Sequence, residues 1–188
     1  MLLASEKYKC AAEILSICAM LSNNAAIFYR PKDKVIHADT ARKNFFVPGG
    51  DHLTLLNVYN QWAQTDYSSQ WCYENYIQHR SMKRARDIRD QLEALLERVE
   101  IEITTNPLDT AAIRKCITAG YFYHTARLSK GGNYKTVKHN QQVSQWEGFF
   151  GPDPYGSFYY LLYLLSIQSG TNRTVQARLS VIAIAGLS

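Results

Sequence analysis

Several motifs that define enzyme classes are missing from this sequence of 188 residues. It contains no Gly-x-x-x-x-Gly-Lys-Ser/Thr loop to cradle a phosphate, no Gly-x-Ser-x-Gly elbow and no His-Glu-x-x-His pair. The glycine pair at 131–132 is too short to form a nucleotide-binding loop. The residues alone therefore indicate a binding or scaffold module without a recognisable catalytic centre of its own.

Cysteine is sparse and its spacing excludes the common metal sites. The four residues are Cys10, Cys18, Cys72 and Cys116. None forms a Cys-x-x-Cys pair, and no histidine spacing completes a zinc site. We expect no metal and predict buried free thiols in a reducing compartment.

Long hydrophobic runs are also lacking. The apolar stretch Phe158–Leu165 is far shorter than the ~20 residues that a helix needs to span a bilayer. The first residues lack the basic region of a signal peptide, and Glu6 and Lys7 interrupt the apolar start early. We therefore expect no membrane anchor.

What is present is ordinary apolar content, a mild basic excess and many tyrosines. Apolar residues make up 46% of the chain, the net charge is +5, and there are 13 tyrosines. This length and composition predict one large or two small globular domains. The charge is compatible with nucleic-acid binding, although it fits a basic domain without such a partner equally well. Tyrosines beside cations can stack on bases, but most tyrosines pack at core edges.

Periodicity and capping residues predict five helices. They are Ser5–Ser22 with Ser5 as the cap, a helix beginning after the cap Asp51, a short helix capped by Ser69, Ser81–Val99, and a helix capped by Asp109, with Gly120 as the residue that follows its end. The segment 27–46 is irregular and basic, and we expect a solvated loop there. His52 invites a role as catalytic base, but without a nucleophile motif a hydrogen-bonded structural histidine is the favoured interpretation.

The predicted helix Ser81–Val99 has an uneven charge distribution. Basic residues crowd its first half and glutamates its second, an arrangement that opposes the helix dipole. A phosphate-rich partner is one explanation for the basic half. Pairing along the helix, such as Arg86 with Asp90, is the alternative.

After Gly120 the pattern changes from helix to strand. The stretches Tyr121–Ser129 and Tyr134–His139 predict a β-hairpin with a basic, glycine-containing tip. Two strands do not form a stable sheet alone, so further strands must cover them. From Ser144 onward the composition shifts again, with clustered glycine and proline.

Seven short segments carry a family pattern through their order and spacing. They are Glu13–Ile17, Ala19–Ser22, Phe28–Lys34, Gly50–Leu56, Trp71–Asn75, Arg84–Arg89 and Gly120–Phe122. Through these segments the chain, from about residue 7 to 143, resembles the C-terminal region of spliceosomal DEAH-box ATP-dependent RNA helicases. The similarity is greatest to the branch that acts before the first splicing step.

This resemblance implies an α+β fold. A mostly helical ratchet domain would occupy residues 1–105, the start of an OB-fold would occupy 106–143, and 144–188 would be a divergent tail without family resemblance. An OB-fold needs about five strands. The family's third strand continues after Val143 in a way that this sequence does not, so we expect the tail not to be a native domain end.

The resemblance also implies function. In this family the ratchet and OB-fold pack on two RecA-like motor domains and help to enclose single-stranded RNA in the nucleus. ATP and Mg²⁺ bind in the motors, whose motifs are absent from this sequence, and the OB-fold region receives G-patch activators. We thus expect no cofactor in this chain. Its partners would be pre-mRNA, the motor domains and spliceosome proteins.

The expected RNA contacts combine the resemblance with the basic residues. They are Arg80, Lys83, Arg84 and Arg86 on the basic helix, and Lys130, Tyr134, Lys135 and Lys138 on the hairpin. Two alternatives remain open. The chain could dock splicing factors or a G-patch activator without contacting RNA, or it could be non-functional in isolation because its OB-fold is interrupted.

Overall fold

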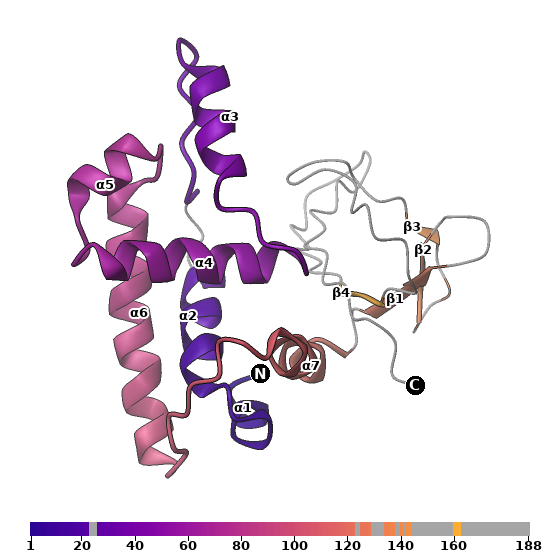
Figure 1. Cartoon of the computed structure of the whole chain (residues 1–188). Helices are drawn as coiled ribbons and strands as arrows, with labels where there is room; N and C mark the ends of the chain where they lie inside the picture. Colours follow the sequence, from indigo (N-terminus) through magenta and orange to yellow (C-terminus); the bar gives the residue numbers. More distant parts are fainter. Residues whose placement is uncertain are drawn as a thin grey trace, which may run out of the picture.

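The computed structural model describes residues 1–22, 26–122, 125–128, 134–137, 140, 142–143 and 160–162. Within them it has seven helices and four short strands (Figure 1). The helices are α1 (Leu2–Tyr8), α2 (Ala11–Leu21), α3 (Val35–Lys43), α4 (Asp51–Gln64), α5 (Ser69–Glu74), α6 (His79–Arg98) and α7 (Thr110–Gly120). The strands are β1 (Thr125–Leu128), β2 (Tyr134–Thr136), β3 (Gln142–Val143) and β4 (Tyr160–Leu162). The described chain is therefore mostly helical. No helix in these ranges combines the length and apolarity needed to cross a bilayer.

The first expected helix, Ser5–Ser22, is interrupted at Lys9. This residue adopts a left-handed backbone conformation with φ 54° and ψ 41°, and α2 begins after Cys10. Ser5 is consequently not a cap but a buried residue inside α1, where its hydroxyl donates a hydrogen bond to the Leu2 carbonyl at 2.6 Å. Periodicity did not reveal the break, because both helices bury apolar residues in the same core.

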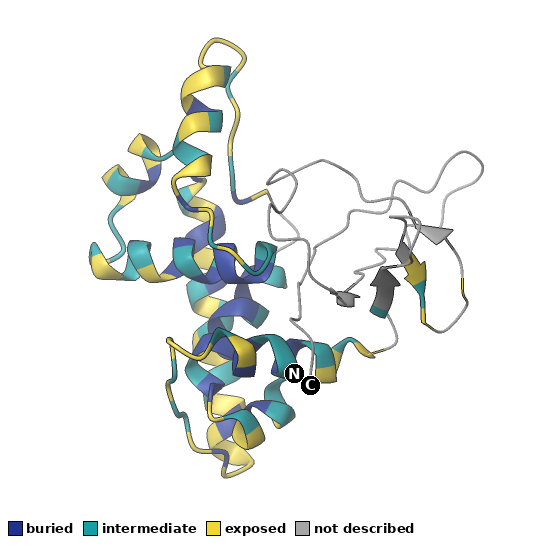
Figure 2. Ribbon diagram, turned by 45° about the vertical axis from the view of Figure 1, so that its right-hand side comes forward, coloured by how far each residue is buried: buried dark blue, intermediate teal, exposed yellow. Residues whose placement is uncertain are grey.

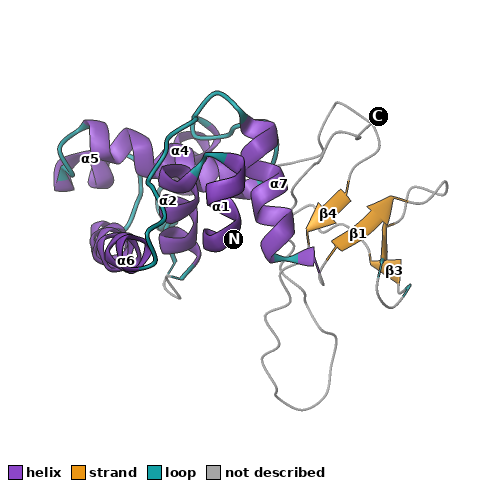
Figure 3. Cartoon of the chain, turned by 90° about the horizontal axis from the view of Figure 1, so that it is seen from below, coloured by secondary structure: helices purple, strands orange, loops and turns teal. Residues whose placement is uncertain are grey.

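The central helix of the body is α2. Eight of its eleven residues are buried, which is typical of a helix surrounded by protein. Helix α6 runs along it, α4 crosses it, and α1 and α7 pack against it (Figures 1 and 3). Figure 2 shows this arrangement as buried residues on the inner faces and exposed residues on the outer ones.

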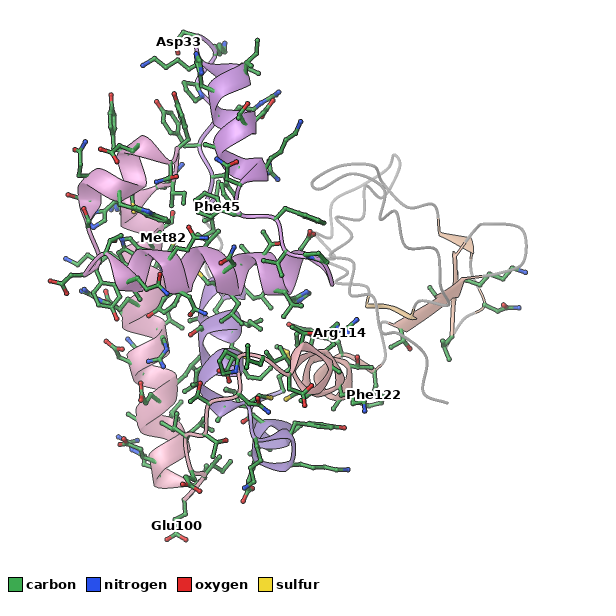
Figure 4. All side chains as sticks on the ribbon, viewed as in Figure 1. Asp33, Phe45, Met82, Glu100, Arg114 and Phe122 are labelled. Carbon is green, nitrogen blue, oxygen red and sulfur yellow. The ribbon has the colours of Figure 1, made fainter. Side chains whose placement is uncertain are left out.

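A second core surrounds Trp62 of α4, which is fully buried. Its members include Met20, Phe45, Cys72 and Met82, from four different parts of the chain. Met82 lies where α4 and α6 cross, and Phe45 lies between α4 and the base of the α3 projection (Figure 4). The indole N–H of Trp62 donates to the carbonyl of Ser68 at 3.1 Å, so the ring is buried without an unmet donor.

The segment 27–46, which we expected to be irregular, contains α3. This helix projects from the body (Figure 1), and Ala38 is its buried residue. Such a short apolar face leaves almost no periodic signal, which explains the wrong prediction. Arg30 holds the preceding loop to the helix through two bonds to the Asp39 carboxylate, at 2.8 and 2.6 Å.

Helix caps were predicted with mixed success. The hydroxyl of Ser68, not of the predicted Ser69, accepts the capping bond of α5 from the Trp71 backbone N–H at 3.2 Å. The Asp109 cap of α7 is confirmed, because its carboxylate accepts from the Ala112 N–H at 2.9 Å. Gly120 is the last residue of α7 rather than the residue after it.

The segment between α6 and α7 is tied to α2 through a buried carboxylate. Oε1 of Glu13 accepts hydrogen bonds from the Thr105 hydroxyl at 2.6 Å and from the Asn106 backbone N–H at 3.1 Å. Helix α7 then places Ile113 and Ile117 in the same core as Ile14 of α2. The chain up to α7 is therefore one packed helical body.

The expected hairpin is confirmed in its described residues. Strands β1 and β2 pair antiparallel with Ala126 opposite Thr136, and the sheet order is β3-β2-β1-β4. These short strands do not by themselves establish an OB-fold, which stays a prediction. The hairpin tip at 129–133 and, apart from β4, the predicted divergent tail 144–188 lie outside the described residues.

Candidate nucleic-acid interface

The first half of α6 carries an exposed cationic face. Arg80, Lys83 and Arg84 are all exposed, and spacings of three and four residues place them side by side on one face of the helix. Asp87 continues the same face one turn later and is also exposed. The face therefore presents three cations and one carboxylate to solvent at the end of α6 that crosses α4 (Figure 1). We call Arg80, Lys83 and Arg84 the cationic face.

Arg86 was predicted to belong with these residues but lies on a different side of the helix. Its side chain is 33% exposed, and its guanidinium carbon lies 5.1 Å from the ring centroid of Tyr67. The carboxylate of Asp87 is 3.9 Å away. Arg86 is therefore partly committed to packing between α6 and the turn after α4.

One ion pair lies within the second half of α6. Arg89 donates to the Glu93 carboxylate at 2.7 Å and to the Ser16 hydroxyl at 3.2 Å, which links α6 to α2. The alternative interpretation of the sequence placed such a pair at Arg86 and Asp90. Pairing within the helix thus accounts for the charge of Arg89 but not for the charges of the cationic face.

The hairpin half of the predicted RNA contacts is only partly described. Lys135 is exposed on β2 opposite Arg127 of β1, and the backbone of Tyr134 pairs with Leu128. Lys130 and Lys138 lie outside the described residues. Strands β1 and β2 lie on the opposite side of α2 and α7 from α6 (Figures 1 and 3). Among the described residues, Lys135 therefore lies apart from the cationic face, and the rest of the hairpin set stays a prediction.

The start of α4 differs from its prediction. Gly50, with φ 115°, is the N-cap residue, and Asp51 is the first helical residue without a capping bond from its side chain. Burial raises the pKa of the Asp51 carboxyl to about 6, against the opposing effect of Arg42. Burial also lowers the pKa of Arg42 to about 10, and its guanidinium lies 5.0 Å from the Phe28 ring centroid.

His52 is a core residue, as predicted, but the predicted hydrogen bond is wrong. The side chain is 1% exposed, and neither ring nitrogen has a hydrogen-bond partner among the described residues. Burial lowers the pKa of the imidazole to about 4. At neutral pH it is therefore uncharged and enclosed, a core position rather than that of an accessible general base.

The cysteines are free, as predicted, and Cys18 and Cys72 are poorly suited to nucleophilic chemistry. Burial raises the pKa of both the Cys18 and the Cys72 thiol to about 11, so both are protonated at neutral pH. A hydrogen bond with Cys10, together with burial, raises the pKa of Cys116 as well. Within the described ranges no three His, Cys, Asp or Glu side chains are grouped to hold a metal ion.

Sequence reasoning missed a pocket between α5 and the loop before α3. Its volume is about 270 Å³, and its lining includes three tyrosines from two distant segments. The lining residues are Tyr29, Pro31, Asp33, Lys34, Tyr73, Glu74 and Tyr76. The abundance of tyrosine was the available signal, but nothing local in the sequence brings position 29 beside 73 and 76.

The N-terminal part of this body matches a known family. Residues 1–55 match the family model described as helicase associated domain (HA2), ratchet-like. The matched segment comprises α1, α2, α3 and the first turn of α4, so the cationic face of α6 lies beyond it. Residues 1–55 are therefore similar to a ratchet-like domain of the helicase-associated type.

Proposed function

We propose that this chain is an accessory C-terminal portion of a DEAH-box ATP-dependent RNA helicase of pre-mRNA splicing, and that it binds single-stranded RNA. The matched helicase-associated domain supports the class, and the cationic face of α6 carries the RNA-binding part of the proposal. The chain would act in the nucleus beside RecA-like motor domains that hold ATP and Mg²⁺. The sheet after α7 would belong to an OB-fold.

The cationic face would hold the backbone of the strand rather than read its sequence. Arg80, Lys83 and Arg84 are exposed and spaced along about one turn of helix, so their charges can reach neighbouring phosphates. Arg86 would contribute less, because its guanidinium already lies against Tyr67. Such contacts give affinity that falls with salt and shows little base preference.

An exposed apolar pair at the C-terminal end of α6 supports packing on the motor domains. Leu95 of α6 and Val99, the C-cap residue that follows the helix, are 51% and 55% exposed and lie four residues apart. Burial of these exposed apolar side chains against another domain would be favourable. The motor domains are the partner that the proposed class supplies.

Salt titration of RNA binding tests the proposal. We would measure binding of labelled oligouridine to the full chain by fluorescence anisotropy over a range of salt concentrations. Arg80→Ala, Lys83→Ala and Arg84→Ala combined should weaken binding and make the salt slope shallower by about 2, at about 0.7 per phosphate contact. The control combines Lys7→Ala, Lys43→Ala and Arg98→Ala, which removes three exposed cations elsewhere.

Equal losses in the two triple variants would show that net charge, not the cationic face, drives binding. The same titration is made on a variant in which Ala replaces Lys130, Tyr134, Lys135 and Lys138. Unchanged affinity for RNA would show that the hairpin is not part of the interface. Absence of RNA binding together with capture of a G-patch activator would favour the alternative, a protein-docking module.

A further inference from the structure

A short antiparallel pairing places two of the three pocket tyrosines side by side. The backbone N–H of Tyr29 donates to the carbonyl of Tyr76 at 2.9 Å, and Phe28 is bridged to Ile77 next to it. The two tyrosine rings are 6.3 Å apart between centroids and inclined by 33°. The two inclined rings form a shallow aromatic groove. The backbone pairing between their segments fixes the position of both residues.

The third tyrosine completes the pocket from α5. Tyr73 is 71% exposed, so the protein's own core does not require its ring. Tyr29 is 45% exposed as well. Asp33 lies at the outer end of the α3 projection (Figure 4) and lines the same pocket as Pro31. The rings of Tyr29, in the loop before α3, and of Tyr73, on α5, are therefore exposed to solvent with their hydroxyl groups.

The charges at the pocket distinguish it from the cationic face. Two carboxylates, Asp33 and Glu74, line it against a single amine, Lys34. Glu74 accepts a bond from Gln70 at 2.8 Å through one oxygen. A net negative lining on a chain of net charge +5 disfavours the phosphates of a nucleic acid and favours a cationic partner.

We propose that this pocket binds a proline-rich peptide segment that carries an arginine. Proline rings of a polyproline II helix fit the angles between inclined aromatic rings, and tyrosine hydroxyls can donate to the exposed peptide carbonyls. The preformed helix loses little conformational entropy on binding. The arginine would be attracted by Asp33 and Glu74, which set the direction of the peptide across the pocket.

Binding of labelled oligoproline peptides to the full chain tests this proposal. One probe ends in arginine, a second ends in glutamate, and labelled oligouridine serves as the nucleic-acid probe. We expect binding of the arginine peptide, and we expect Tyr73→Ala to weaken it by at least about tenfold, as loss of a central aromatic contact does. Because Tyr73 is 71% exposed, this variant should fold normally, which a thermal melt would verify.

Two further variants separate the contributions. Glu74→Gln should weaken the arginine peptide several-fold and leave the glutamate peptide unchanged or improved. Leu108→Ala, at a side chain that is 94% exposed outside the pocket, is the matched surface control and should bind like the parent chain. Loss of the cationic face of α6 should not weaken peptide binding, so this proposal and the RNA proposal can fail independently.

The proposal is overturned if Tyr73→Ala binds the arginine peptide as the parent chain does. It is also overturned if neither peptide binds at millimolar concentration. Binding of oligouridine that Tyr73→Ala weakens, with no peptide binding, would instead identify the pocket as a base-stacking site.

Discussion

Burial changes the chemistry of individual residues most at the start of α4. Asp51 and His52 are neighbours in the sequence, yet burial moves their pKa values in opposite directions, to about 6 and about 4. The reason is the same for both, since each neutral form is easier to bury than the charged one. Acidification should therefore destabilise the fold through His52 and stabilise it through Asp51.

Replacing His52 should flatten the response of the fold to acid. The folded imidazole has a pKa of about 4 and the unfolded one about 6.5, so only the unfolded chain gains a proton between these values. The stability that His52 contributes is present above pH 6.5 and is lost as the pH falls toward 4, by up to roughly 3 kcal/mol. Urea unfolding of the parent chain and His52→Leu across this range measures it.

The neighbouring carboxylate supplies the control for this experiment. Asp51→Asn removes the opposing contribution, which grows as the pH falls from about 6 to 3.8. The variant should therefore lose stability in acid more steeply than the parent chain. Parallel stability curves for the parent and His52→Leu would contradict the enclosed, unprotonated state of His52.

At the scale of elements, helices begin where local chemistry and packing agree. The Asp109 cap of α7 is readable from the sequence, because a carboxylate before an apolar repeat satisfies free amides. The break between α1 and α2 is not, because Lys9 has no local preference for the left-handed conformation that it adopts. Packing of both helices into one core imposes that conformation.

Glycine at position 9 should stabilise the turn between α1 and α2. Lys9 has φ 54°, a conformation that a β-carbon disfavours and glycine adopts freely. Lys9→Gly should raise the free energy of unfolding by about 0.5–1 kcal/mol. Chemical denaturation measures the difference. Lys7→Gly, inside α1, is the matched control and should destabilise by a similar amount.

A loss of stability in Lys9→Gly would contradict the left-handed turn. It would indicate instead that one continuous helix runs through this position, as the periodicity of Ser5–Ser22 predicts. The two glycine variants therefore distinguish a broken helix from an unbroken one without a new structure.

At the scale of the whole molecule, the helical body extends past the predicted ratchet boundary at residue 105. Glu13 ties Thr105 and Asn106 to α2, and Ile113 and Ile117 of α7 share a core with Ile14. The sheet follows α7 and lies to the other side of it from α6 (Figure 1). The packing therefore makes α7 part of the helical body rather than of the sheet.

Limited proteolysis should leave a resistant fragment that ends after α7, near residue 121, rather than near 105. Removal of α7 would expose the apolar side chains of Ile14, Ile17 and Leu53 that pack against it, at a cost of several kcal/mol. Mass spectrometry of tryptic fragments locates the boundary. Thermal melting of chains ending at 105 and at 122 then compares their stability, and equal melting temperatures would contradict a shared core.

The sequence by itself determined most helices, the hairpin pairing and the basic character of α6, because periodicity, caps and charge act over a few residues. Its similarity to helicase-associated regions agrees with the family match at residues 1–55. Helix α3 escaped notice because its buried face is so small.

Only the tertiary structure decided which cations face solvent and which aromatic rings meet. One side of α6 packs on α2 and on the turn after α4, and there Arg86 lies over Tyr67. The side that remains exposed carries Arg80, Lys83 and Arg84. The tyrosine pocket joins positions 29 and 76 through a backbone pairing that no local pattern specifies. Contacts between distant segments depend on the whole packed core, so they emerge only once that core exists.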